Sequence, residues 1–376
     1  MNIIGVVVEY NPLHNGHLHH YLSIKERFPD SLVIAVMSGY TTQRGEICVF
    51  DKWTRAELAL KLGVDIVAEL PFVYTNNNAE IFSSRSVDYL NQLKVNKIVI
   101  GSEANLSNYN KYLNLLKNPS YNLLVKSYLK KGFSYKESTV QAMKDSNVTP
   151  LLSNDTLGLF YYKRIVERNY NIELQSIKRV SSNYNDKVLS DSTITSATSI
   201  RNTTNDFKRY VPYFVYNKYK TIGFLDENKI FKYLKFELNR NQNIKEIALT
   251  NEGFYNTVKK ARNSKNLNNL RSCLTSKRYT TSRINRILLN TLFDLRNSKL
   301  EEALNREIDY IRVLGFNKRG KEYLSSIKKS INIYTNIKEG INLILDIEFY
   351  VAETLSFIYN KNYLEREQGS PIIIKD

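Results

Sequence analysis

The chain has 376 residues, a formal net charge of +17, 42% hydrophobic residues and 24% charged residues. This length allows two domains, each with a core of its own. No apolar run approaches the roughly 18 residues that a bilayer span needs, which argues against an integral membrane protein. Two distant cysteines, Cys48 and Cys273, argue against a disulfide framework and a thiolate metal site. The first ten residues lack the marks of a secretion signal, so we expect a cytoplasmic protein.

The positive charge is unevenly distributed and predicts a polyanionic partner. Residues 1–203 hold 23 Lys and Arg against 18 Asp and Glu, a net charge of +5. Residues 204–376 hold 31 against 19, a net charge of +12. The alternative explanation of the positive charge is a codon bias that enriches Lys along with Asn, Tyr and Ile, in which case the charge would not indicate a partner.

The first hundred residues alternate short β-branched runs with helical patterns. We predict strands at 3–8, 31–37, 64–70 and 97–101, and helices at 16–27, 51–63 and 79–93. In the second helix, Asp51 is a plausible N-cap and Gly63 a stop signal. Strands that alternate with helices predict a parallel sheet with right-handed crossovers.

The pattern changes twice further along the chain. Residues 105–150 are helical and polar, as in an insertion or cover, and are followed by a helix at 156–168 and a strand at 172–180. The polar stretch 181–195 is expected to be a mobile lid. After residue 203 the segments are amphipathic and helical, including 282–295 and 341–360. The predicted fold class is α/β: a Rossmann-like parallel-sheet nucleotidyltransferase domain (1–203), followed by a mainly α-helical, basic domain (204–376).

All four histidines of the chain lie within seven residues, directly after the first predicted strand. Ligands of open parallel sheets bind beyond the carboxyl ends of the strands, where this loop lies. A helix that begins at Gly16 directs its free N–H groups towards a bound phosphate. His14 and His17 can donate hydrogen bonds to phosphate oxygens, where charge shifts during substitution at phosphorus. A solvated helix start and a zinc site are the alternatives, although no Cys or carboxylate ligand accompanies the histidines locally.

His14-Asn15-Gly16-His17 is the HxGH signature of the nucleotidyltransferase superfamily, and "TSATSIR" (195–201) resembles its late ISSTxIR motif. Ser196, Thr198 and Arg201 occupy the polar positions of the second motif.

The resemblance can be narrowed by further stretches. They include "GVVVEYNPLHNGHLHH", "VMSGYTTQRGE", "GVDIVAELPFVY", "IFSSRSVDYLN", "SIKRV" and "YIRVLGFNKRGKEYL". Together they resemble the tRNA(Met) cytidine acetate ligase family from Met1 into the last quarter of the chain. Ile47 stands where we expect Pro in that family.

The resemblance implies an enzyme that activates acetate with ATP to acetyl-adenylate and acetylates the wobble cytidine of elongator tRNA(Met). It implies His14, His17, Thr198 and Arg201 as catalytic residues. The implied ATP site comprises Val7, Val8, Glu9, Tyr10, Asn11, Pro12, Leu13, His14, Asn15, Gly16, His17, Leu18, His19, His20, Gly101, Asn154, Arg179 and Ser196. Asn154 can instead be a helix N-cap, and Arg179 a surface residue. Mg²⁺ is expected from the phosphate chemistry, without a dedicated protein metal site.

The basic second part is expected to bind the tRNA. Lys277, Arg278, Arg283 and Arg286 cluster around Tyr279, whose ring can stack on an exposed base. The alternative is a solvated helix face over an apolar stripe. We expect changes at Arg283 and Arg286 to weaken tRNA binding and leave the ATP chemistry intact. No protein partner is inferred. Two other functions remain open: adenylyl transfer to a small metabolite, or RNA binding without catalysis.

Overall fold

A computed structural model of the chain describes residues 1–102, 106–179, 193–203, 207–240, 243–250, 253–277 and 279–374. The predicted alternation of strands and helices in the first part is confirmed. The strands are β1 (Ile3–Val8), β2 (Leu32–Ser38), β3 (Ile66–Leu70), β4 (Lys97–Ser102) and β5 (Glu173–Lys178). They pair in parallel in the order β5-β4-β1-β2-β3. The strand order therefore reverses between β1 and β4, the topological switch point where open α/β sheets bind their ligands.

The sheet is covered on both faces, and β2 shows why. All seven of its residues are buried, and alternate side chains enter two different cores. Val33, Ala35 and Met37 face helices α1 (Asn15–Arg27), α2 (Lys52–Leu62) and α10 (Tyr213–Ile222). Leu32, Ile34 and Val36 face α4 (Ala79–Gln92), α8 (Ser153–Arg168) and the helices of the second half. A central parallel strand buried on both faces needs such an uninterrupted apolar run.

The predicted ends of α2 are confirmed. Asp51 accepts a hydrogen bond from the Thr54 backbone N–H at 2.8 Å and so caps the first turn. Gly63 ends the helix with φ of 114°, a left-handed conformation.

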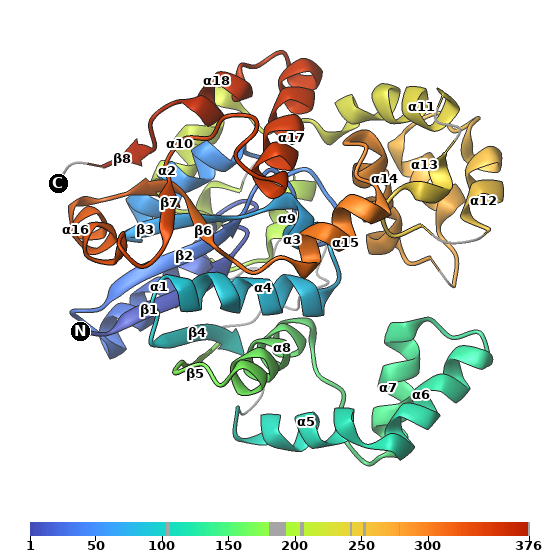
Figure 1. Ribbon diagram of the computed structural model, residues 1–376, viewed down its shortest axis with the longest axis horizontal. Helices are drawn as coiled ribbons and strands as arrows, with labels where there is room; N and C mark the ends of the chain where they lie inside the picture. Colours follow the sequence, from blue (N-terminus) through green and yellow to red (C-terminus); the bar gives the residue numbers. More distant parts are fainter. Residues whose placement is uncertain are drawn as a thin grey trace.

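The polar stretch after β4 forms a helical arm, as predicted for an insertion. It contains α5 (Tyr109–Lys117), α6 (Pro119–Lys130) and α7 (Tyr135–Asp145), and it projects away from the sheet in Figure 1. We call residues 109–148 the arm. Its small apolar cluster around Tyr121, Val125 and Ala142 is separate from the two cores of the sheet.

The second half is helical up to residue 305. After α10, its α-helices are α11 (Phe231–Arg240), α12 (Phe254–Ala261), α13 (Leu267–Leu274), α14 (Thr281–Leu292) and α15 (Asn297–Asn305). Helices α11 to α14 gather at one end of the molecule, on the same side of the sheet as the arm (Figure 1). Among the described helices, none combines the length and the apolar character that a membrane crossing requires.

The chain then returns to the sheet, which the sequence analysis did not predict. Strand β6 (Tyr310–Phe316) pairs antiparallel with β3, and β7 (Asn332–Tyr334) and β8 (Ile372–Ile373) pair with β6. Helices α16 (Lys318–Ile327), α17 (Leu343–Tyr359) and α18 (Tyr363–Gln368) complete this segment. The second half is mainly α-helical, as predicted, and these three strands are the part that the sequence analysis missed. The division into two domains at that residue stays a prediction.

A buried ion cluster fastens this C-terminal segment to the sheet. The Lys52 ammonium lies 2.6 Å from Glu69 of β3 and 2.9 Å from Glu367 of α18, and all three side chains are fully buried. Glu348 of α17 is 3.9 Å from the same ammonium, and burial, followed by the charge of Glu69, raises the pKa of Glu348 well above its usual value. Removing one partner of such a cluster leaves a buried charge uncompensated, which is strongly destabilising. The cluster therefore favours the observed packing of the C-terminal segment against the sheet.

Candidate functional site

The loop after β1 fixes both motif imidazoles through their Nδ1 atoms. His14 is the N-cap of α1, and its Nδ1 accepts from the Gly16 N–H at 3.1 Å. His17 Nδ1 accepts from the His14 N–H at 3.2 Å, and the two ring centroids are 3.8 Å apart. Because a neutral imidazole that accepts at Nδ1 carries its proton on Nε2, both rings offer an Nε2–H donor.

Both imidazoles are held in the neutral form. Burial, followed by the charges of Arg179 and Arg201, lowers the pKa of His14 to about 3. Burial and then His14 lower the pKa of His17 well below its usual value. Near neutral pH the pair is therefore two uncharged hydrogen-bond donors.

The second motif lies directly against the first, although about 180 residues separate them in the sequence. Helix α9 (Ala197–Asn202) carries Arg201, whose guanidinium donates to the Asn11 carbonyl at 2.8 Å. The same guanidinium donates to Thr198 Oγ1 and to Glu46 Oε2, each at 3.3 Å. Asn15 Nδ2 donates to the Thr193 carbonyl at 2.9 Å. These contacts join the two ends of the predicted site.

Two predicted glycines lie directly against side chains of other predicted site residues. A Cβ on Gly16 would lie 2.9 Å from the His14 ring, so the glycine makes room for that imidazole. A Cβ on Gly101 would lie 3.2 Å from Arg179 Cγ. The Arg179 side chain therefore crosses the end of β4 beside Gly101.

Asn154 lies at the start of α8, but it is not the N-cap. The helix begins at Ser153 with Leu152 as its N-cap, so the N-cap interpretation of Asn154 was wrong. Its neighbour Asp155 is buried and accepts a hydrogen bond from Ser102 Oγ at the end of β4. This bond brings the start of α8 to the carboxyl edge of the sheet, beside Gly101.

The remaining predicted nucleotide residues have several local roles. Ser196 Oγ caps α9 by accepting from the Ser199 N–H at 3.1 Å. Tyr10 presents its ring edge-on to His17, with the centroids 5.0 Å apart. Leu13 is fully buried. The others flank the histidines in β1, in the loop and in the first turns of α1: Val7, Val8, Pro12, Leu18 and His19.

Two buried nitrogen atoms of the site lack a protein hydrogen-bond partner among the described residues. They are Asn11 Nδ2 and His20 Nε2. Burial lowers the pKa of His20 to about 4, so this ring is also neutral near pH 7. A buried polar atom without a partner is costly, and a bound ligand can satisfy it.

The loop 43–46 contributes two contacts that the sequence analysis missed. The Gln43 N–H donates to Glu9 Oε1 at 2.7 Å, and Glu46 pairs with Arg201. Burial raises the pKa of Glu9, with the neighbouring Glu46 acting in the same direction. The "QRGE" stretch is part of the family resemblance, but its place beside the histidines follows only from the fold.

The predicted RNA-binding residues do not form one exposed patch. Lys277 is exposed, and Arg278 lies outside the described residues. Arg283 covers the Tyr279 ring at 4.5 Å, and Tyr279 is only 6% exposed. The expectation that Tyr279 stacks on a base was therefore wrong.

Arg286 faces the candidate site instead. Its guanidinium donates to the Gln43 carbonyl at 3.2 Å, and burial lowers its pKa to about 10. Gly45, at φ of 77°, packs against the backbone of α14 at the same point. A Cβ at this position would lie 2.4 Å from the backbone nitrogen of Arg286. Helix α14 therefore supports the loop that holds Glu9. The lid predicted at 181–195 falls largely outside the described residues.

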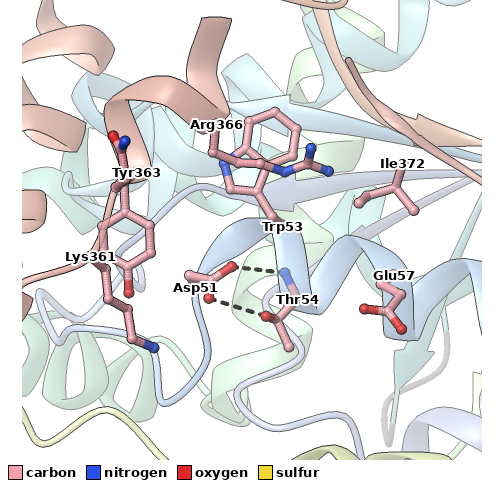
Figure 2. A pocket seen from close by; sticks show the side chains of 9 residues that line it. Asp51, Trp53, Thr54, Glu57, Lys361, Tyr363, Arg366 and Ile372 are labelled. Carbon is pink, nitrogen blue, oxygen red and sulfur yellow. Dashed lines mark hydrogen bonds between the residues drawn. The ribbon is translucent and has the colours of Figure 1, made fainter. Parts of the chain in front are cut away.

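A cavity of about 340 Å³ lies elsewhere, at the start of α2 (Figure 2). Its lining residues are Asp51, Trp53, Thr54, Glu57, Lys361, Asn362, Tyr363, Arg366 and Ile372. The Asp51 carboxylate occupies the helix N-terminus there through its two bonds to Thr54. A phosphate would be repelled by that carboxylate, so the motif residues remain the better candidate for a nucleotide site. No group of three or more His, Cys, Asp or Glu that could hold a metal ion occurs within the described ranges.

The switch-point sheet and the paired motifs define a nucleotidyltransferase of the HxGH class. A family model described as HIGH nucleotidyl transferase matches residues 1–370. A tRNA(Met) cytidine acetate ligase of Caldicellulosiruptor saccharolyticus is 36% identical over 100% of this chain and 99% of its own. One of Fusobacterium nucleatum is also 36% identical, over 100% and 99%. The chain belongs to the tRNA(Met) cytidine acetate ligase family.

Solved structures agree with this assignment. The apo crystal structure of Thermotoga maritima TmcAL superposes with a TM-score of 0.87 at 29% identity, and both chains are covered fully. The same protein bound with alpha-thio ATP gives 0.85 at 28% identity, again with full coverage.

Proposed function

We propose that the protein activates acetate with ATP and transfers the acetyl group to the wobble cytidine of elongator tRNA(Met). The observation that carries this proposal is the contact between the two motifs, in which Arg201 donates to the Asn11 carbonyl at 2.8 Å. It brings a guanidinium and two neutral imidazoles to one site, and fixed donors of this kind stabilise the charge that develops during substitution at a phosphorus centre. ATP is the nucleotide because a structural relative binds its alpha-thio analogue.

In the first half-reaction, an acetate oxygen attacks the α-phosphorus of ATP and the bond to pyrophosphate breaks. The Nε2–H groups of His14 and His17 would donate to phosphate oxygens as their charge changes. Because both rings are neutral before the reaction, they stabilise the phosphate by donating hydrogen bonds and do not act as charged imidazolium acids. Arg201 and Thr198 would hold the leaving pyrophosphate from α9.

The nucleoside of ATP would lie on the side of the site opposite the phosphate-binding residues of α9. Arg179, Gly101 and Asn154 lie at the ends of β4 and β5 and at the start of α8, on the far side of the switch point from β2. Asn154 offers an amide that can pair with an adenine edge. Asn11 Nδ2 is a buried donor that remains available to substrate. Magnesium would arrive on the ATP phosphates, held by their oxygens and by water.

In the second half-reaction, the exocyclic amine of cytidine attacks the acetyl carbon, AMP leaves, and the amine loses one proton. The names of the curated relatives support tRNA(Met) as the acceptor. The basic second half, with a net charge of +12, fits an RNA partner.

Acetate-dependent exchange of pyrophosphate into ATP, followed by acetyl transfer to tRNA(Met), tests the proposal. We expect exchange with acetate alone and acetylcytidine only when tRNA is added. Exchange that depends on a small alcohol or phosphate ester in place of acetate would favour a metabolite adenylyltransferase. RNA binding without any exchange would favour the non-catalytic alternative.

A further inference from the structure

The positive charge of the first half is concentrated in the arm. Residues 109–148 hold seven lysines against two acidic residues, a net charge of +5. The other residues of 1–203 hold 16 basic and 16 acidic side chains, a net charge of zero. A codon bias that enriches lysine would act on the whole chain, so it does not explain this distribution.

The lysines of the arm are available to a partner. All seven are exposed: Lys111, Lys117, Lys126, Lys130, Lys131, Lys136 and Lys144. Within the described part of the chain, none of them forms an ion pair with a carboxylate. Lysines of the neighbouring sheet and helices do form such pairs, as Lys97 does with Glu173 and Lys163 does with Glu80.

Aromatic side chains are interleaved with these lysines at the tip of the arm. The turn between α6 and α7 passes through Gly132, at φ of 86°, and exposes Phe133 to 40% and Tyr135 to 70%. Lys131 lies over the Tyr128 ring at 5.0 Å. Lysines that can contact phosphates, beside rings on which bases can stack, are the combination found on proteins that bind single-stranded nucleic acid.

The arm emerges from the candidate nucleotide site. It leaves the sheet after Ser102 at the end of β4 and returns at Asp155 in the first turn of α8, and these two residues are hydrogen-bonded to each other. Both attachment points are therefore next to residues assigned to the nucleoside, Gly101 and Asn154. An RNA held along the arm would therefore lie close to the candidate nucleotide site.

The tip of the arm also approaches the second half of the chain. Hydrogen bonds from the backbone and side chain of Ser134 lower the pKa of Glu137, and the charge of Lys277 adds to this effect. Lys277 belongs to the segment predicted to bind RNA, and Figure 1 shows the arm and α11 to α14 projecting on the same side of the sheet. The two basic regions therefore share one side of the molecule.

We propose that the arm is a second RNA-binding surface, whose lysines hold the tRNA backbone and whose tip aromatics stack on unpaired bases. This inference deepens the proposed function and rests on tRNA being the acceptor. An acidic protein partner would need the lysines but would give no use for exposed rings beside a nucleotide site.

The test compares two triple variants with the same change in net charge. One replaces Lys130, Lys131 and Lys136 of the arm with Ala. The control replaces the exposed Lys321, Lys328 and Lys329, in and directly after α16 at the opposite end of the molecule (Figure 1). For each, tRNA(Met) affinity is measured across a salt series, together with acetate-dependent pyrophosphate exchange and thermal stability.

We expect the arm variant to bind tRNA at least tenfold more weakly than the control variant. Its log–log salt slope should be shallower by about 2, since each lost phosphate contact contributes about 0.7 to 0.9. Pyrophosphate exchange and stability should match the wild type. Tyr135→Ala should weaken binding about tenfold, whereas Tyr135→Phe, which keeps the ring, should not.

Equal tRNA affinity in the two triple variants would overturn the inference, because the arm lysines would then meet no RNA. That result would leave the proposed function intact as long as exchange and acetylation persist. Absence of acetate-dependent exchange in the wild type would instead refute the proposed function, whatever the arm variants do to RNA binding. The two failures are thus told apart by different measurements.

Discussion

The nucleotide site and the arm handle negatively charged partners in different ways. In the site, two neutral imidazoles, one buried (His14) and one half-buried (His17), are fixed by backbone N–H groups, and one guanidinium is held at 2.8 Å from a carbonyl. On the arm, seven exposed lysines form no ion pair with a carboxylate among the described residues, and they lie along three helices, of which α6 and α7 share a small core. The site depends on position, because catalysis needs donors aimed where charge develops. The arm depends on charge, which acts over a distance and falls with salt.

The largest effect should come from a donor of the site. His17→Ala removes an Nε2–H group from the phosphates and should lower acetate-dependent pyrophosphate exchange by about 10² or more. His14→Ala should act similarly. Leu22→Ala, at an exposed position of the same helix outside the predicted site, is the control and should retain most of the exchange. Near-normal exchange in the His17 variant would show that the pair does not act on phosphate.

A change at Arg286 tests whether helix α14, in the second half of the chain, also supports the nucleotide site. The sequence alone predicts that changes at Arg283 and Arg286 spare the ATP chemistry, but Arg286 donates to the Gln43 carbonyl in the loop that holds Glu9. Arg286→Ala should therefore reduce exchange about tenfold, as expected when a supporting hydrogen bond worth about 1.4 kcal/mol is lost.

Arg283→Ala is the paired comparison, since its guanidinium donates to the distant Leu249 carbonyl at 3.0 Å. It should leave exchange unchanged. If both single variants keep full exchange, loop 43–46 needs no support from α14. The prediction from the sequence, that changes at Arg283 and Arg286 spare the ATP chemistry, would then hold.

The buried histidines should make the free protein sensitive to acid. The pKa of His14 is lowered to about 3 and that of His20 to about 4 in the folded chain, whereas the unfolded value is about 6.5. Below about pH 6.5 the unfolded chain binds protons that the folded chain does not, so stability falls as the pH falls towards 4. Each such histidine contributes a slope of about 1.4 kcal/mol per pH unit.

Chemical denaturation of the nucleotide-free protein between pH 7 and 4.5 measures this slope. His20→Gln should reduce the slope of the unfolding free energy against pH by about 1.4 kcal/mol per pH unit, the contribution of one histidine. The arm variants should not change this slope. An unchanged slope in the His20 variant would mean that this ring is protonated in the fold.

The smallest effect should be local to the arm. Val125→Ala enlarges the small cluster beside Tyr121 and Ala142 and should destabilise α6 and α7 by about 1–3 kcal/mol. Hydrogen exchange should accelerate in these helices and stay unchanged in β1 and β2, because the arm does not share their cores. Acceleration throughout the sheet would show that the arm is not an independent unit.

The features that depend on local sequence pattern were predictable from the amino-acid sequence. Alternating apolar runs predicted β1 to β5 and the helices between them, because a strand buried on both faces must be continuously apolar. Asp51 and Gly63 marked the ends of α2 through local capping chemistry. The histidine motif was also recognisable from the sequence, because its four residues are consecutive and three of them, His14, Gly16 and His17, are hydrogen-bonded to one another.

Tertiary structure decided what depends on partners distant in the chain. Strand β6 was missed because its pairing with β3 joins residues about 245 positions apart, and the Lys52 cluster brings together β3, α17 and α18. Tyr279 looked free to stack but is covered by Arg283, and Arg286 turned out to face the loop beside Glu9. Exposure, ion pairing and the neighbours of a charged side chain are properties of the packed molecule, and a pattern of residue types does not contain them.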